Sequence, residues 1–568
     1  MPNVVYHLLR RLHLPLIVLV LVYAVSTLGF VLIPGQDDQG RPWHMDFFHA
    51  FYFVSFMGST IGFGEIPYPF TEAQRAWTTV SIYATVIAWL YGIGALLTTL
   101  QDPAFRRLMV ETRFRRAVRH LREPFYLVCG YGDTGSQLVA ALAEEGIMTV
   151  VVDIREERIR EVELSDLPYL PPALCADASV PSVLQQAGLQ SPHCRALIAL
   201  TDDDEANLAA AVAAHLLNPS VRVIARAERP ELQANIASFG ANDVLNPYEL
   251  FAGRLALALH SPGMYVLFEW MTGVPHEPLQ EPLFPPHGRW ILCGYGRFGK
   301  AVYRRLAEEG VQATVVEADP ERTDAPWDAV VGVGTQPDTL EEAGIHEALG
   351  IVAGTDNDIN NLSIIATARE LNPNLFMVAR QNQTSNDPLF AAANLALVMK
   401  RGSVIAHKIF ALLRTPLIGD FLDLAREQGN DWANQLVSRI LGVVTDEVPQ
   451  IWEVEITPDG APGFFDAPPA CTPTVDALRR DPRDRSLRLE CIPLLLRRGT
   501  ERLLLPGEDT PLEEGDHLLF CGSQVARSEM EWIVNNVNAL HYVLTGVERP
   551  HGAIWRWLRR GEHPACPG

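Results

Sequence analysis

One short segment of the chain has the residue types and spacing that suit the binding of a dehydrated cation. Residues 60–64 alternate bulky side chains with glycines, in the order Thr60, Ile61, Gly62, Phe63 and Gly64. Glycine enters left-handed backbone conformations at little steric cost, so this alternation can point successive carbonyl oxygens in one direction. Four copies around an axis would stack rings of oxygen atoms that replace the water shell of a potassium ion. The hydroxyl of Thr60 can supply the innermost ring.

A second group of residues has the spacing of a phosphate-binding loop. Residues 125–153 comprise a short apolar run, the motif GxGxxG, a helical pattern and a second apolar run that ends in an acid. Glycines let the backbone turn tightly and approach a pyrophosphate at the N-terminus of a helix. The residues of this predicted loop are Gly130, Tyr131, Gly132, Asp133, Thr134 and Gly135. Asp153 is placed to accept hydrogen bonds from ribose hydroxyls and to repel a 2'-phosphate, which favours NAD, ADP or ATP over NADP.

The same pattern occurs a second time, 164 residues further along the chain. The counterparts of the three glycines and of the acid are Gly294, Gly296, Gly299 and Glu317. From the fourth predicted strand onward the interval falls to 154, where Thr355, Asn361 and Arg380 repeat Thr201, Asn207 and Arg226. The second copy is therefore ten residues shorter in between. The sequence indicates a tandem duplication.

The densest acidic run lies in the first copy. Asp202, Asp203 and Asp204, next to Glu205, bring together carboxylates that could bind calcium. The run lacks the spacing of an EF-hand loop, and runs of like charge are usually exposed to water. A solvated turn is therefore favoured over a calcium site, and the sequence assigns no metal ligands beyond these three candidates.

Two uncharged segments, residues 14–34 and 76–100, are long enough to cross a bilayer as helices. The first exceeds the apolar core of a signal peptide and is followed by no small-residue cleavage site, so we expect it to be retained. Residues 45–65 between them are too short to span, and their apolar part, 45–64, ends in glycines. Irregular backbone at membrane depth is tolerated where it is buried in protein or lines an aqueous path. This segment is predicted to be a re-entrant pore helix followed by a filter.

Charge and cysteine content narrow the class of protein. Arginines gather after the second span while the loop between the spans is acidic, which by the positive-inside rule puts both termini in the cytoplasm. The chain has 46 basic and 68 acidic residues, and this net charge of -22 argues against nucleic acid as a partner. The eight cysteines are scattered and contain no CxxC pair, so reduced thiols are expected. Cys129 and Cys293 each precede a glycine motif and are predicted to be structural.

The segment STIGFGE, residues 59–65, resembles the potassium-channel signature TVGYGD and lies between two spans as in that family. Phe63 replaces a tyrosine whose hydroxyl braces the filter in the family, and Glu65 replaces an aspartate at the outer mouth. The resemblance implies a potassium-selective pore, since the backbone supplies most of the ligands. In related channels a glycine in the inner helix lets that helix bend. Gly92 and Gly94 are therefore candidates for a gating hinge, although close helix packing explains them equally well.

Both copies of the duplicated part resemble the RCK family, also called TrkA-N or KTN. Copy one has the family's pattern at residues 176–179, 201–207 and 217–219, which read ADAS, TDDDEAN and LNP. The family uses the aspartate that corresponds to Asp177 near the adenine side of its ligand. Copy two has GVGT at this turn, so copy one is expected to be the better nucleotide site. Arg297, within the second glycine loop, could contact a phosphate.

These parts give a predicted order of domains. The fold class is a membrane α domain, with two spans and a re-entrant pore helix and filter, then two tandem Rossmann-like α/β RCK N-lobes and a small α+β C-terminal lobe. The predicted domains are a pore domain at residues 1–100, a connector at 101–123, N-lobes at 124–285 and 286–445, a C-terminal lobe at 446–523, and a tail at 524–568 that looks helical to Arg560. This order resembles the GsuK-type channels of bacteria, which several ligands gate.

The leading hypothesis is a ligand-gated potassium channel without enzyme activity, in the inner membrane of a bacterium. A homotetramer would form one filter in the lipid bilayer and a cytoplasmic ring of eight N-lobes. NAD, ADP or ATP would bias the gate, with calcium as a further ligand. The alternatives are a regulatory NAD-binding subunit of a potassium transporter and a membrane-tethered NAD-dependent oxidoreductase. The filter pattern counts against both, and no His, Lys or Tyr constellation marks a hydride-transfer site.

Overall fold

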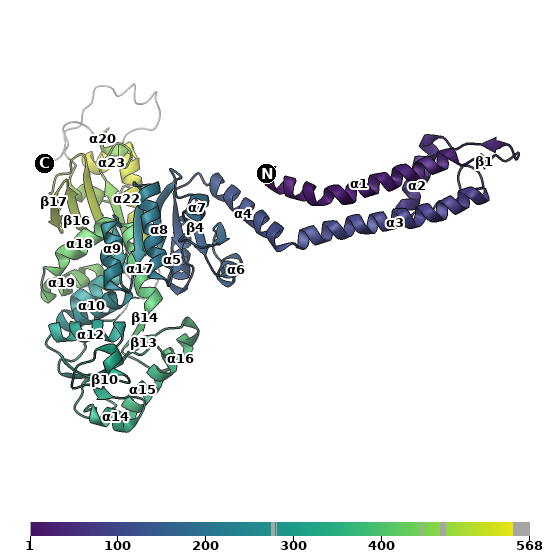
Figure 1. The fold of residues 1–568 in the computed structure, drawn as a ribbon. Coiled ribbons are helices and arrows are strands. Elements are labelled where there is room, and N and C mark those ends of the chain that lie inside the picture. The colour runs from purple at the N-terminus through teal and green to yellow at the C-terminus, as the bar shows by residue number, and fades with distance from the viewer. Residues whose placement is uncertain (1, 274–278, 280, 445–446, 466–472, 549–568) are drawn as a thin grey trace. The chain divides into compact units, whose positions relative to one another are not determined.

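The computed structural model describes residues 2–273, 279, 281–444, 447–465 and 473–548 (Figure 1). The chain divides into two compact units, Met1–His120 and Leu121–Gly568, and each is described by itself. The stretch of the predicted helical tail from residue 549 to Arg560 lies outside the described residues.

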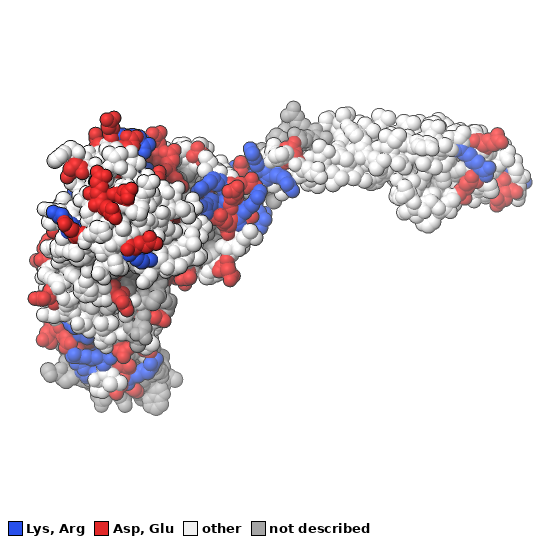
Figure 2. All heavy atoms as spheres, turned by 90° about the horizontal axis from the view of Figure 1, so that it is seen from below, with Lys and Arg blue, Asp and Glu red and all other residues white. Residues whose placement is uncertain are grey.

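The first unit contains two long helices with a shorter helix between them. The elements are α1 Pro2–Leu32, β1 Gly35–Gln36, β2 Pro42–Trp43, α2 Phe47–Gly58, α3 Glu72–Gln101 and α4 Pro103–His120. Leu12–Leu32 of α1 and all of α3 are long and apolar enough to cross a membrane. Figure 2 shows few charged side chains on the face of these spans in view, with charges gathered at the end that carries β1 and β2.

Caps and close contacts define the ends and the packing of these helices. Asp46 precedes α2, and its side chain accepts a hydrogen bond from the backbone N–H of His49. A capping box between Thr71 and Gln74 starts α3. α1 packs closely on α3 at Gly29, where a Cβ would lie only 2.1 Å from the Trp77 ring. The chain leaves the helical conformation after α2, so the predicted filter residues follow a short helix, as expected of the predicted pore helix.

The second unit begins with a six-stranded parallel sheet of order β5-β4-β3-β6-β7-β8. The strands are β3 Phe125–Cys129, β4 Met148–Asp153, β5 Ala173–Cys175, β6 Cys194–Ala199, β7 Arg222–Arg226 and β8 Asp243–Leu245. The connecting helices are α5 Asp133–Glu144, α6 Glu156–Leu164, α7 Pro181–Gln186, α8 Asp204–Leu217 and α9 Pro230–Ser238. We call this sheet with these helices the first lobe. The strand order reverses between β3 and β6, and ligands of doubly wound sheets bind at the carboxyl ends of the strands beside such a reversal.

The second lobe repeats this topology with the order β11-β10-β9-β12-β13-β14. Its strands are β9 Arg289–Cys293, β10 Gln312–Glu317, β11 Val330–Val331, β12 Gly350–Ala353, β13 Phe376–Gln381 and β14 Leu397–Lys400. Its helices are α12 Arg297–Glu308, α13 Pro320–Thr323, α14 Pro337–Glu342, α15 Asp358–Leu371, the 3-10 turn η1 Thr384–Asn386 and α16 Asp387–Ala392. Helix α13 has 4 residues where α6 has 9, which accounts for part of the predicted shortening of the second copy.

The helices that follow the two sheets are exchanged between the lobes. α10, Pro247–His260, follows the first sheet but packs on α12, and its Phe251 lies in the hydrophobic core of the second lobe. α17, Arg401–Arg414, follows the second sheet but packs on α5, and its Phe410 lies in the core of the first lobe. Each lobe therefore completes its core with a helix of the other copy. The boundary predicted at residue 285 follows the order of the chain but does not separate independent cores.

The remaining elements form a four-stranded antiparallel sheet of order β15-β18-β16-β17, covered by helices on both faces. The strands are β15 Gln450–Glu455, β16 Cys491–Arg498, β17 Glu501–Leu504 and β18 Asp516–Gly522. α11 Pro262–Thr272, α18 Leu417–Arg426 and α19 Asn430–Leu441 share one core with this sheet. The opposite face packs on α20 Pro462–Phe465, α21 Val475–Leu478, α22 Gln524–Asn535 and α23 Val537–Thr545. α22 and α23 thus belong to the core of the C-terminal lobe, although the predicted boundary at residue 523 placed them in a separate tail.

Candidate functional site

The first glycine loop connects β3 to α5 beside the reversal in strand order. Gly130 has a φ of +101°, and a Cβ there would lie 2.8 Å from the carbonyl carbon of Leu200. A Cβ at Gly135 would lie 2.0 Å from the carbonyl oxygen of Gly130. Neither position can hold a side chain. At Gly132 the nearest atom to a Cβ would be Nη2 of Arg155 at 3.8 Å, so the backbone is open to a ligand there.

Asp153, at the end of β4, holds this loop in place. Its carboxylate accepts hydrogen bonds from the backbone N–H of Tyr131 at 2.7 Å and of Arg155 at 2.8 Å. A carboxylate offers about four lone-pair positions, so positions remain for ligand hydroxyls. In the second lobe Glu317 accepts from the backbone N–H of Tyr295 at 2.5 Å. In each lobe, the acid at the end of the second strand thus supports the glycine loop of that lobe. The spacing of the motif does not reveal this role.

A cavity of about 600 Å³ lies over the carboxyl ends of the first-lobe strands, and we call it the strand-end cavity. Its lining includes Gly130, Gly132, Asp153, Arg155, Asp177 and Thr201. The structure therefore brings Asp153 and Asp177, both predicted ligand contacts, to one space. Its volume is in the range of small-molecule sites.

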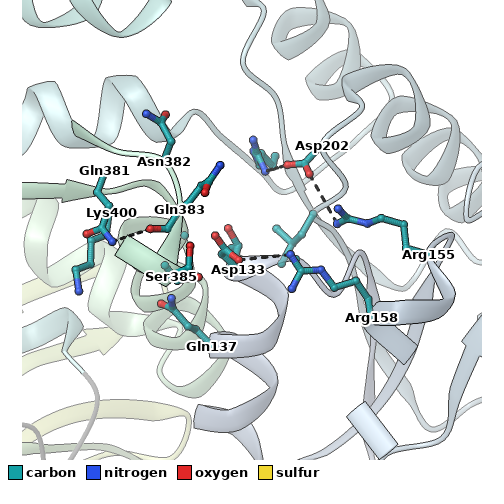
Figure 3. A pocket seen from close by; sticks show the side chains of 16 residues that line it. Asp133, Gln137, Arg155, Arg158, Asp202, Gln381, Asn382, Gln383, Ser385 and Lys400 are labelled. Carbon is teal, nitrogen blue, oxygen red and sulfur yellow. Dashed lines mark hydrogen bonds and ion pairs between the residues drawn. The ribbon is translucent and has the colours of Figure 1, made fainter. Parts of the chain in front are cut away.

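A second cavity of about 600 Å³ adjoins the first and lies between the lobes; we call it the interlobe cavity (Figure 3). The first lobe contributes Gly132, Asp133, Thr134, Gln137, Arg155, Arg158, Leu200, Asp202 and Arg226. The second lobe with the start of α17 contributes Gln381, Asn382, Gln383, Thr384, Ser385, Lys400 and Gly402. Gly132, Arg155, Leu200 and Asp202 line both cavities. The sequence motifs do not predict any of the contributions from the second lobe.

The three calcium candidates are engaged by cations and backbone N–H groups. Asp202 lies 3.0 Å from Nη1 of Arg226, and Asp203 caps α8. Asp204 is only 7% exposed and accepts a hydrogen bond from the backbone N–H of Glu228 at 3.1 Å. A solvated turn is therefore wrong for Asp204, whose carboxylate ties the start of α8 to the loop after β7. Among the described residues, one set of acids and a histidine has ligand atoms within 4.8 Å of one another, in the C-terminal lobe: Glu453, Glu455 and His517.

Arg297, the predicted phosphate contact of the second loop, is engaged by the first lobe. Its Nη1 lies 2.8 Å from Oε2 of Glu228, which is 7% exposed. The guanidinium of Arg297 also lies 5.8 Å from the ring centre of Tyr248, and that of Arg380 lies 5.2 Å from the same ring. The turn from β9 into α12 otherwise repeats the first one: the predicted glycines Gly294 and Gly296 lie between β9 and α12, and Gly299 lies in the first turn of α12.

The backbone φ angles of the predicted filter residues alternate between the left-handed region and other regions. Thr60, Gly62 and Gly64 have φ values of +62°, +67° and +98°, whereas Ile61 and Phe63 are outside the left-handed region. Such an alternation can turn successive carbonyl groups toward one side of the segment. The filter assignment itself stays a prediction.

Contacts from the pore helix and from α3 support this segment. The carboxylate of Glu65 accepts from Nε of Arg75 at 2.8 Å and from the backbone N–H of Phe70 at 2.8 Å. Phe63, which lacks the hydroxyl of the family's tyrosine, packs edge-on against Phe56 of α2 with ring centres 5.5 Å apart. The filter is thus supported by an ion pair and an aromatic contact.

The two hinge candidates lie in an unbroken part of α3. A Cβ at Gly92 or at Gly94 would meet no described atom of this chain within 4 Å. Close packing within the chain therefore does not explain either glycine. The hinge assignment stays a prediction.

The cysteines before the glycine loops are fully buried. Burial raises the pKa of the Cys129 and Cys293 thiols to about 12 in each case. The thiolate is the reactive form, so these side chains are unreactive at neutral pH and act as small core residues.

Comparison with known families agrees with this arrangement. Residues 17–102 match the family model for ion channels, and residues 126–247 and 290–400 each match the model for the TrkA-N domain. The chain contains an ion-channel domain and two TrkA-N domains. The matched ion-channel region covers most of the first candidate span, all of α3 and the predicted filter, and each TrkA-N match covers one of the parallel sheets.

The chain is also homologous to potassium channel proteins. It is 25% identical to potassium channel protein 1 of Methanocaldococcus jannaschii over 345 residues, which cover 60% of this chain and 96% of that protein. It is 25% identical to the voltage-gated potassium channel Kch of Escherichia coli K12 over 209 residues, or 36% of this chain and 48% of that one. Among solved structures, the GsuK channel superposes with a TM-score of 0.48 at 18% identity, covering 94% of this chain and 100% of that chain. The GsuK channel bound to NAD gives a TM-score of 0.46 at 16% identity, with the same coverage of both chains.

Proposed function

We propose that this chain is one subunit of a homotetrameric potassium channel, selective for potassium over sodium, whose pore is opened or closed by NAD, ADP or ATP. The observation that carries the proposal is the alternating backbone of residues 60–64, between two membrane-length helices, on the same chain as a nucleotide-sized cavity at a glycine loop. Four such segments would surround an ion with carbonyl oxygens. The homology to potassium channel proteins supports this assignment.

The proposed gating mechanism uses the covalent connection between the two units. α3 continues through α4 into β3, the first strand of the first lobe, with only residues 121–124 between α4 and β3. A ligand that binds more tightly to one shape of an eight-lobe ring would bias the pore through these connections. The ligand can shift the gate only by the difference between its binding free energies for the open and closed states, typically about 1–3 kcal/mol per coupled site.

The proposed location is the inner membrane of a bacterium with both termini in the cytoplasm. The arginines of α4 follow the second span and support this orientation. The TrkA-N domains then face the cytoplasmic nucleotide pool. The acids at 202–204 already have cationic and N–H partners, so the proposal assigns them no calcium.

The test measures potassium and sodium flux in liposomes that contain the purified protein, with and without each nucleotide. We expect potassium flux that responds to nucleotide, and we expect Gly62→Ala to abolish it while nucleotide binding persists. Gly62 has a φ of +67°, where a Cβ costs roughly 1–2 kcal/mol and displaces the filter carbonyls.

Gly40→Ala is the matched control. Gly40 lies between β1 and β2, has a φ of +74°, and a Cβ there would meet nothing within 4 Å. This variant carries the same backbone strain outside the filter and should conduct normally. Equal passage of sodium and potassium, or no passage of either under every nucleotide condition, would contradict the proposal and favour an oxidoreductase or a transporter subunit.

A further inference from the structure

The interlobe cavity has one wall from each lobe because α17 brings the second lobe against the start of α5. Gly402 lies in the first turn of α17, where a Cβ would be 3.0 Å from the carbonyl carbon of Asp133 and 3.1 Å from the nitrogen of Thr134. Any side chain at this position would push the two helices apart. Figure 3 shows the result: the side chains of Gln381, Asn382, Gln383 and Ser385 lie on one side of the cavity, and those of Arg155 and Arg158 lie on the other.

The first-lobe wall carries an unused hydrogen-bond donor. Arg226 is only 3% exposed, and its Nη atoms pair with Asp202 and Glu228. Its Nε–H has no acceptor among the described residues. A buried donor without a partner costs about 1–3 kcal/mol. Arg155 and Arg158 line the same wall together with Asp133 and Asp202, the carboxylates that pair with them. Three guanidinium groups thus lie next to the open backbone at the glycine loop, where they can donate to the pyrophosphate of a ligand.

The second-lobe wall carries an unused acceptor. Gln381 is also 3% exposed, and its amide nitrogen donates to the carbonyl oxygen of Gln383 at 2.9 Å and to Oδ1 of Asp387 at 2.5 Å. These two acceptors fix the orientation of the amide, so Oε1 is the atom without a partner among the described residues. A ligand that completes this wall must therefore offer a donor.

The requirement for a donor distinguishes between ligand classes. The phosphates of ADP or ATP offer acceptors at neutral pH, whereas ribose hydroxyls and a carboxamide offer donors. The second-lobe wall is also nearly neutral, since residues 381–385 are amides and hydroxyls and Nζ of Lys400 lies 3.1 Å from Asp387. A second nucleoside fits this wall better than a terminal phosphate.

The space beside the second glycine loop is smaller and more acidic: a cavity of about 360 Å³ there is lined by Asp202, Asp203, Asp204, Glu228, Arg229 and Arg297. By the interval of 154 residues, Tyr248 stands in the first lobe where Gly402 stands in the second, and Glu228 stands where Asn382 does. Tyr248 is 3% exposed, packs on Phe298 with ring centres 6.2 Å apart, and its hydroxyl lies 3.3 Å from the Glu228 carboxylate. A tyrosine and a glutamate thus stand at the second loop where the interlobe cavity has Gly402 and Asn382 at the first, which leaves less room and adds a negative charge.

We propose that each chain binds one dinucleotide across both lobes: the adenosine half in the strand-end cavity, the pyrophosphate beside Arg226, and the second nucleoside against residues 381–385 of the second lobe. Gln381 acts as a specificity-determining residue, and Tyr248 with Glu228 closes the second glycine loop to ligand. This inference rests on the proposed function, because it concerns the nucleotide site that we assign to the gate.

The test titrates the full-length protein in detergent with NAD and, separately, with AMP, which lacks the pyrophosphate and the second nucleoside. The wild-type chain should bind one NAD. Gln381→Met removes the acceptor at similar volume and should weaken NAD binding about tenfold, while AMP binding stays within about twofold. Gln312→Met, at an exposed position at the start of β10, is the matched control and should change neither affinity.

Each other outcome is decisive. An equal loss of NAD and AMP affinity, or no loss of either, would overturn the role of Gln381, and two NAD per chain would overturn the closure of the second loop. If neither nucleotide bound the wild-type chain, both the inference and the nucleotide gate would be wrong. If NAD bound as expected but never changed potassium flux, the inference would stand and the proposed function would fail.

Discussion

Gly132 and Gly135 stand in the same loop but have different environments. A Cβ at Gly135 would lie 2.0 Å from backbone, whereas one at Gly132 would meet only the end of a flexible arginine at 3.8 Å. Gly132 is free for ligand contact, whereas Gly135 is needed for the loop to close. Their substitutions should therefore separate binding from folding.

We predict that Gly135→Ala lowers the free energy of unfolding by about 1–3 kcal/mol and abolishes nucleotide binding, because the backbone of Gly130 must move. Gly132→Ala should leave stability within about 0.5 kcal/mol and weaken binding, because its methyl group blocks the approach to the backbone. Thermal unfolding and nucleotide titration of both variants provide the check. Equal thermal stability of the two variants would show that this loop is not as tightly closed as described.

His407 on α17 gives the lobes a predictable response to acid. Burial, with the charge of Arg254 on α10, lowers the pKa of His407 to about 4. The unfolded chain takes up this proton at about pH 6.5, so the native state binds fewer protons between about pH 6.5 and 4, and stability falls as the pH falls through that window. The expected loss across the window is about 1–3 kcal/mol.

The measurement compares thermal unfolding at pH 7.5 and 5.5. His407→Gln should reduce the difference between the two midpoints, and His346→Gln, at an exposed histidine, should not. A difference that is the same in the wild type and in both variants would mean that His407 does not contribute to the acid response.

The residues of the strand-end cavity could largely be predicted from sequence, because a glycine loop and the acid after the next strand form one local unit. Gly130, Gly132 and Asp153 are examples. Arg226 and Gln381 could not be predicted as partners in one site. They lie in different lobes, and only the packing of α17 on α5 brings them to one cavity.

At the scale of elements, the filter depends on the start of α3. Glu65 follows the filter directly and is held by Arg75 of α3 and by the backbone N–H of Phe70. The pair is largely exposed, and such pairs contribute little to stability. Its expected role is to fix the position of the filter.

We predict that Glu65→Gln lowers the ratio of potassium to sodium flux with little change in thermal stability, since a neutral amide binds Arg75 less tightly. Liposome flux measures the ratio. Glu72→Gln removes the same charge from the first turn of α3, outside this contact, and should keep the wild-type ratio. An unchanged ratio in Glu65→Gln would mean that the pore helix alone positions the filter.

The two sheets and the two spans were predictable because hydrophobic runs and glycine motifs act over short distances along the chain. The exchange of α10 and α17 between the lobes could not be predicted in this way. Phe251 and Phe410 would fit either lobe by composition, and the choice depends on how the finished lobes pack.

At the scale of the whole molecule, a ligand held from both lobes should protect both. We predict that NAD slows amide hydrogen exchange at residues 130–135 and also at 381–386 of the second lobe. The second glycine loop, residues 294–299, should show no added protection beyond that of a general stabilisation. At a ligand concentration of 100 times Kd that stabilisation is about 2.7 kcal/mol.

AMP serves as the control ligand, because it should protect residues 130–135 without 381–386. Protection by NAD that is confined to the first lobe would show that the second lobe does not contact the ligand.

The exchange of α10 and α17 affects how the chain is made on the ribosome. Domains usually fold one after another as they emerge, but here the face of α5 that receives Phe410 stays uncovered until the entire second sheet has been translated. A product that terminates early, after the first TrkA-N domain, would expose this apolar face and be recognised by chaperones and proteases. Incomplete subunits would thus be removed before they could join the proposed tetramer.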